Sequence, residues 1–592
     1  MESPSPRTPT SPRRWTLEEY MKLRNDWELP TRGHSYLAHV KALCGRWPHL
    51  GFLADFMEVG TSPLRWNSPG RGGYSRDTVK KEQERNERAR RTHVCLLRYD
   101  KDGTKPISKE VCKSPHELDN ALYDLKTPSE KDISGFNLIV VEDLSRDVIE
   151  LLGSHLDVDP SFFRQHIANR AWHKVGDWWK EPPNLDVAFS GQNWLSIRYI
   201  RARCFPDEES FCRGSSEAAD FNVDRRLDRD WNHSNFWDGA DGKKEVGIIR
   251  SRASLWIKPL HNPNDKAVGI LLLDPSITEG HRLWHNYRNW EKPPLMMDPK
   301  PHEESMSGGN PNQETFFEDF IHWACKPKSF EFMPTSDASR AEVASGPNLD
   351  VPLSALLHLV CTEWLMVSDY IETRLSQIDW ELAKPRDWGD SARVDEVAGR
   401  LNFWRRAVPM YRKMLSEALV QVFRETAHLP GLPGPGHMRL RGVLQPLLGT
   451  PAVASYRPDF YLALAAMHEH QARADKLLEI TVATVSIEES RNGYRMNKKL
   501  SNLTWLATAF LPLSFVATLL SVQEDITALA NSLSYWARIA IPLTVFTMLI
   551  LAIWDMPVTT RLRQKLDQRS RRNKWIGRES TDSGQWRNSQ SI

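Results

Sequence analysis

The sequence predicts an α/β cytoplasmic domain, a long stalk helix and a C-terminal two-helix transmembrane hairpin. Residues 503–522 contain no charged side chain, and a second apolar run, residues 535–554, follows after a short polar loop. A helix needs about 20 mostly apolar residues to cross roughly 30 Å of hydrocarbon. Short β-branched runs occupy the first half of the chain, and helical periodicity continues from residue 457 into the first apolar run. A buried helical hairpin in a soluble protein is the alternative to two membrane spans.

Length and composition restrict the number of domains and the classes of partner. At 592 residues the chain is long enough for two to four units of about 150 residues each. The 78 Lys and Arg residues nearly balance the 76 Asp and Glu residues, so we expect no nucleic-acid partner. The seven cysteines include no CxxC pair and resemble reduced cytosolic thiols.

The N-terminal half is expected to form a mixed α/β domain. Residues 1–90 are interpreted as a disordered or helical region, and residues 91–330 as the α/β domain, with a helix over Ser145–His155. The run Phe136–Glu142 is apolar enough for a central strand, whereas Asn193–Cys204 alternates apolar and basic residues and predicts one wet face. The expected strands are His93–Tyr99, Phe136–Glu142, Asn193–Cys204, Val246–Lys258 and Val268–Asp274.

Helical patterns dominate the second half. Residues 331–456 are predicted as a cytoplasmic helical region with helices over Leu353–Leu382 and Val394–Ala427, followed by the stalk helix, residues 457–502. A loose heptad along the stalk implies a neighbouring helix. His468 and His470 are two residues apart, point different ways and are expected to face solvent. The heptad positions are Leu464, Met467, Gln471, Ala474, Leu478, Thr481 and Val485.

Charge placement predicts the topology. Basic residues flank both apolar runs on the sides away from the connecting loop, residues 523–534, which has no Lys or Arg. Because cytoplasmic flanks carry the Lys and Arg excess, we expect a multi-pass protein with both termini cytoplasmic, an external loop and a basic cytoplasmic tail, residues 555–592. The flanking basic residues are Arg491, Arg495, Lys498, Lys499, Arg561, Arg563, Lys565, Arg569, Arg571, Arg572 and Lys574.

The polar residues of the first apolar run form a stripe along one side of the helix, at about 100° per residue. In a bilayer such a stripe faces protein or water, although the threonines could equally bond to their own helix or pack against the second span. Two helices cannot enclose a pore, so conduction requires a ring of several copies. The candidate pore-lining residues are Thr504, Thr508, Leu511, Phe515 and Thr518.

Three segments resemble the CorA metal-ion transporters, in particular their divergent eukaryotic branch. They are FLPLSFVATLLSVQ at Phe510–Gln523, LIVVEDLSRDVIELLGSHLDVDPSFFRQHI and SYWARIAIPLTVFTMLI. The resemblance covers about residues 90–560 and implies a CorA-like fold, a homopentamer with a funnel-shaped cytoplasmic domain, and first spans that line the pore. It also implies passage of hydrated divalent cations, with magnesium typical and zinc carried by some relatives.

The chain departs from the family at the pore mouth. The family closes its first span with Gly-Met-Asn, where this chain has Ser521, Val522 and Gln523. Gln523 keeps a carbonyl oxygen that could contact a hydrated cation, but on a longer arm, and Ser521 removes a glycine. Glu524 and Asp525 follow as an outer acidic ring that attracts cations, or as solvated loop acids.

Transport of divalent cations, magnesium or zinc, is therefore the function that the sequence predicts. The rival is a non-conducting membrane-anchored scaffold or sensor that keeps the architecture without the filter. We expect no enzymatic activity and no cofactor besides the transported cation, because the sequence offers no convincing nucleophile–base arrangement and no phosphate-binding glycine loop.

Overall fold

The structure is a computed structural model that places the chain in two compact units, Met1–Glu479 and Ile480–Ile592, with the boundary inside one helix. The described residues are 33–62, 83, 86–100, 106–126, 135–168, 179–181, 192–230, 245–259, 267–283, 315–325, 349–383, 391–423, 448, 450–521 and 529–555.

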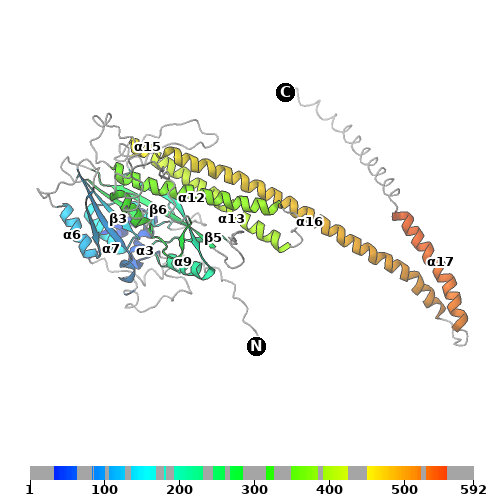
Figure 1. The fold of residues 1–592 in the computed structure, drawn as a ribbon. Coiled ribbons are helices and arrows are strands. Elements are labelled where there is room, and N and C mark those ends of the chain that lie inside the picture. Colours follow the sequence, from blue (N-terminus) through cyan, green and yellow to red (C-terminus); the bar gives the residue numbers. More distant parts are fainter. Residues whose placement is uncertain are drawn as a thin grey trace, which may run out of the picture. The chain divides into compact units, whose positions relative to one another are not determined.

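A mixed eight-stranded sheet forms the centre of the first unit (Figure 1). The strand order is β2-β1-β3-β7-β6-β4-β8, with β5 paired to β6. The β3–β7 pair is parallel and the other pairs are antiparallel. The strands are β1 (His93–Tyr99), β2 (Pro106–Cys112), β3 (Phe136–Glu142), β4 (Trp194–Phe205), β5 (Leu227–Asp230), β6 (Glu245–Ile257), β7 (Ala267–Leu273) and β8 (His281–Arg282).

Helices cover both faces of the sheet and create two hydrophobic cores. On one face the core joins the sheet to α2 (Ser35–Cys44), η1 (Pro48–Leu50), α3 (Gly51–Val59), α6 (Pro115–Lys126), α7 (Arg146–Leu156) and α8 (Pro160–Ile167). On the other face it joins the sheet to α11 (Phe316–Cys325), α12 (Asp350–Leu382), α13 (Ser391–Phe423), α15 (Pro451–Ala454) and the first part of α16 (Arg457–Leu520). A third, smaller cluster forms around α9 (Glu208–Asp220).

The five predicted strands are confirmed as β1, β3, β4, β6 and β7, each within one residue at either end, and the predicted helix is α7. Strand β3 lies inside the sheet and all seven of its residues are buried, as its apolar run predicts. Strands β2, β5 and β8 were not predicted, because β2 is polar and exposed while β5 and β8 are very short.

The wet face predicted for the fourth strand is wrong. Strand β4 is buried along its length, because α12 and α13 pack against it and α8 lies on the other face of the sheet. Those arginines have partners instead of solvent: Arg198 pairs with Glu417, Arg201 donates to Ser276 Oγ at 2.7 Å, and Arg203 donates to backbone carbonyls. In β4 the alternation of apolar and basic residues therefore marks arginines that have partners inside the protein, and not a solvent-exposed face.

The stalk heptad has its neighbouring helix within the same chain. Leu464, Met467 and Ala474 of the heptad lie in the core shared with α12 and α13. His470 is buried and hydrogen-bonds Ser368 of α12 at 3.1 Å, so its predicted exposure is wrong, whereas His468 is exposed. Within the first unit, this part of the heptad is therefore satisfied without a second copy.

Two helices of the described chain are long and apolar enough to cross a membrane, judged by length and composition. Helix α12 is 72% buried over its most apolar window and is a core helix of the first unit. The other, Pro451–Thr518, contains most of the first predicted span and is only 12% buried over that window. In the second unit, α17 (Leu529–Asp555) contains the second predicted span, residues 535–554, and exposes Ile539, Val545 and Phe546.

Candidate functional site

The five candidate pore-lining residues follow one another along α16 in the second unit. Leu511 and Phe515 are 69% and 60% exposed, Thr504 and Thr518 are exposed, and Thr508 is half-buried. Large apolar side chains with this exposure are unusual for water-facing helices and ordinary for helices covered by lipid or by another copy.

The threonine hydroxyls bond to their own helix. Thr504 Oγ1 donates to Leu500 O at 2.9 Å, Thr508 Oγ1 to Thr504 O at 2.7 Å, and Thr518 Oγ1 to Ser514 O at 2.8 Å. A hydroxyl has one proton and two lone pairs, so each oxygen keeps acceptor capacity after this bond. These three threonine oxygens therefore remain available as hydrogen-bond acceptors.

A groove of about 350 Å³ lies between α16 and α17 and takes in part of the stripe. The two helices are also joined by Trp536 Nε1, which donates to Leu513 O at 3.3 Å, and a proline lies in the interior of each, Pro512 in α16 and Pro542 in α17. The groove is lined by Thr504, Ala507, Thr508, Leu511, Pro512, Phe515, Leu543 and Thr547.

The stripe extends beyond the five residues that were predicted from the sequence. Continued toward the N-terminus in alternating steps of three and four residues, it meets no charged residue as far back as Ile480, and its side chains there are exposed, with Ile487 at 54% and Tyr494 at 72%. Such alternation is the seam of a helix that packs on another helix. The added residues are Ile480, Ala483, Ile487, Ser490, Tyr494, Asn497 and Ser501.

The predicted pore mouth is described only at its first residue. Ser521 is exposed and its Oγ donates to Thr518 O at 2.9 Å. Val522, Gln523, Glu524 and Asp525 lie outside the described residues. Among the residues that the structure describes, no group of three or more His, Cys, Asp or Glu side chains could hold a metal ion.

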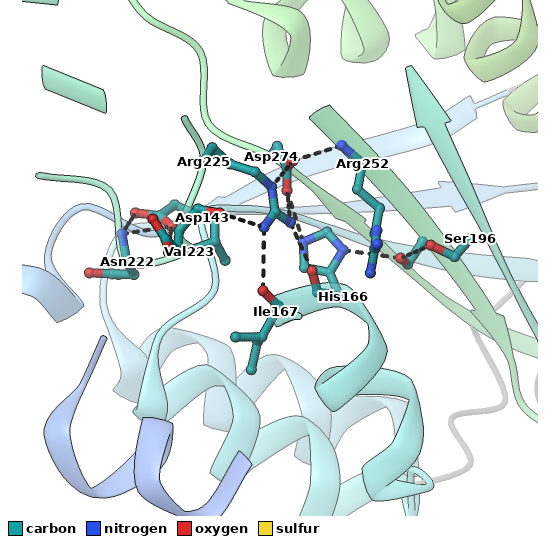
Figure 2. Close-up of polar contacts among 11 residues, drawn as sticks. Asp143, His166, Ile167, Ser196, Asn222, Val223, Arg225, Arg252 and Asp274 are labelled. Atoms are coloured by element: carbon teal, nitrogen blue, oxygen red, sulfur yellow. Dashed lines mark hydrogen bonds and ion pairs between the residues drawn. The ribbon is translucent and has the colours of Figure 1, made fainter. Parts of the chain in front are cut away.

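A second polar constellation, which the sequence did not reveal, lies inside the first unit (Figure 2). Ser254 Oγ is 3.0 Å from His166 Nδ1, and His166 Nε2 is 3.3 Å from Asp274 Oδ1. The order Ser–His–Asp is that of a nucleophilic triad. Burial argues against that role, because Ser254 is 1% exposed and His166 and Asp274 are fully buried.

Arg225 and the backbone N–H of Arg252 bind Asp274, so this group of residues has a structural role, and we call it the Asp274 clamp. Arg225, from the segment after α9, forms a bidentate pair with Asp274, and its Nη2 also donates to His166 O at 2.8 Å. The backbone N–H of Arg252 donates to Asp274 Oδ2 at 2.6 Å. Burial, and then the charges of Arg225 and Arg252, hold the pKa of His166 well below its usual value, so the ring is neutral. Asp274 thus ties β6, α8 and the Arg225 segment together.

The chain's similarity to known proteins comes from solved structures. No family model matches the chain, and no curated protein matches it. Among solved structures, the chain is similar to the complete structure of the CorA magnesium transporter from Methanocaldococcus jannaschii, with a TM-score of 0.34 and 11% identity over 78% of this chain and 98% of that one. A TM-score of this size does not assign the fold.

Proposed function

We propose that the chain is a membrane protein that passes divalent cations, magnesium or zinc, through a pore lined by α16 at the centre of a homo-oligomeric ring. The observation that carries the proposal is the exposed, charge-free stripe from Ile480 to Thr518. An apolar helix places such a stripe against water or protein when it crosses a bilayer. In a closed ring, the same stripe of every copy faces the axis.

The character of the stripe suits a hydrated cation. Magnesium gives up its water molecules reluctantly, so a pore that carries it must accept hydrogen bonds from those waters. Thr504, Thr508 and Thr518 offer oxygens whose own protons are already donated to the helix. Phe515 lies on the same stripe and is the residue most able to close the pore by excluding water.

The proposal extends to the mouth and to the topology. Gln523 would present a ring of amide oxygens to the hydrated cation, with Ser521 and Val522 beside it and with Glu524 and Asp525 as an outer acidic ring. The resemblance to the CorA family favours five copies. Both termini would be cytoplasmic, and no cofactor other than the transported cation is required.

Cation flux tests the proposal. Purified protein in liposomes should admit magnesium down its gradient, and Gln523→Ala should lower that flux because it removes one amide oxygen from every copy at once. Ser532→Ala, in the same loop, is the matched control and should leave flux unchanged. The combined change Ser521→Gly, Val522→Met and Gln523→Asn should raise magnesium flux if the pore below the mouth is open.

The alternative function is a non-conducting membrane-anchored scaffold or sensor, favoured by the replaced family tripeptide at residues 521–523. Mass measurement in detergent should give a pentamer, and a stable monomer or dimer would remove the pore proposal. If a well-assembled pentamer gives no flux with the native mouth, with the restored tripeptide or with Phe515→Ala, the scaffold function stands.

A further inference from the structure

A basic face of α16 lies beside the charge-free stripe, immediately before the first apolar run. At about 100° per residue, its four basic residues fall within an arc of about 100°, centred roughly 120° around the helix from the stripe. All four are exposed. They are Arg491, Arg495, Lys498 and Lys499.

The charge of this face is one-sided. The sequence contains no acidic residue between Ser490 and Leu520, so that part of α16 carries only positive charge. Trp505 lies seven residues after Lys498, on the same side of the helix, and is half-buried. Tryptophan is enriched at the boundary between hydrocarbon and headgroups, and lysine just outside it.

From this arrangement we propose that the basic face binds the headgroups of anionic phospholipids. The inference rests on the proposed membrane placement of residues 503–522 and adds a lipid partner to it. An electroneutral headgroup would gain little from four like charges, whereas an anionic headgroup gains about 1 kcal/mol, or about five-fold in association, for each nearby Lys or Arg.

The distance of each basic residue from Leu503, measured along the helix axis, ranks the four residues by how strongly they should attract a headgroup. Lys498 and Lys499 are four to five residues before Leu503, or about 6–8 Å at 1.5 Å per residue. The headgroup layer is about 5–8 Å thick, so these two ammonium groups lie within it. Arg495 is about 12 Å and Arg491 about 18 Å from Leu503. Both exceed the Debye length of about 8 Å at physiological ionic strength, so the lysines should contribute most.

Spin-labelled lipids test the inference in proteoliposomes of phosphatidylcholine that contain the full chain. Labelled phosphatidylglycerol should associate with the protein more strongly than labelled phosphatidylcholine. The double variant Lys498→Gln with Lys499→Gln should lower that preference by up to about five-fold for each lysine, and high salt should lower it in the native protein. Lys476→Gln, an exposed lysine of α16 in the other unit, is the matched control and should keep the native preference.

Equal association of the two lipids with the native protein would overturn the inference, as would a double variant that matches the Lys476→Gln control. Loss of the preference on adding inorganic phosphate, but not on adding sodium chloride of equal ionic strength, would assign the face to free phosphate and also overturn it. Failure of the membrane placement has a different signature, because a protein outside the bilayer would immobilise neither lipid. Equal immobilisation of both lipids leaves the proposed transport function standing.

Discussion

Removing the carboxylate of Asp274 should be among the most destabilising single changes in the first unit. The carboxylate accepts two bonds from Arg225 and one from the backbone N–H of Arg252, and His166 lies 3.3 Å away. Asp274 and the Arg225 side chain are both fully buried. Asp274→Ala would leave the Arg225 charge without its counter-charge, and breaking a buried pair in this way costs about 3–5 kcal/mol.

Guanidinium unfolding of the full chain in detergent, followed by tryptophan fluorescence, measures this loss. The matched control is Glu209→Gln, which removes a carboxylate from the surface ion pair with Arg213, where the side chains are 84% and 54% exposed. That change should alter the free energy of unfolding by less than about 1 kcal/mol. Replacing both buried partners, Asp274→Leu with Arg225→Met, should recover part of the loss, because the Arg225 charge is removed together with its counter-charge. If Asp274→Ala costs no more than Glu209→Gln, the clamp does not stabilise the fold.

Three further predictions follow from the same structure and sequence. Burial lowers the pKa of His358 to about 4, so the unfolded state binds more protons than the folded state between pH 6.5 and 4. The free energy of unfolding therefore falls as the pH falls, by about 3 kcal/mol at pH 4. In unfolding experiments His358→Gln should reduce this dependence on pH, and an unchanged dependence would contradict the lowered pKa of His358. A cysteine introduced at Ser532 should react with a membrane-impermeant thiol reagent on intact cells, whereas labelling only after permeabilisation would reverse the topology. Tyr494→Asp, which puts a charge on the exposed stripe, should reduce the mass of the detergent-solubilised assembly, and Lys476→Asp is its control on the same helix.

Much of the fold follows from local sequence patterns. β-branched runs such as Phe136–Glu142 identified the strands within one residue, because side-chain alternation and strand length are local properties. The 20-residue charge-free run likewise predicted a long apolar helix, now part of α16. The stripe from Thr504 to Thr518 is also a local pattern, and its extension to Ile480 could have been found by continuing the same steps of three and four residues.

Tertiary structure alone decided which polar residues are buried and what they contact. The arginines of β4, and His470 on α16, have the local pattern of solvent-facing residues, yet α12 and α13 cover them. Asp274 and His166 are more than 100 residues apart in the chain and meet only because α8 packs on the sheet that contains β6 and β7. Burial and long-range pairing depend on which elements cover one another, and helical or strand periodicity carries no information about that choice. The sequence by itself therefore determined the strands, the helices and the two apolar segments. Tertiary packing determined which charged side chains are buried and which partners they have, because a buried charge is stable only beside a partner that the fold brings to it.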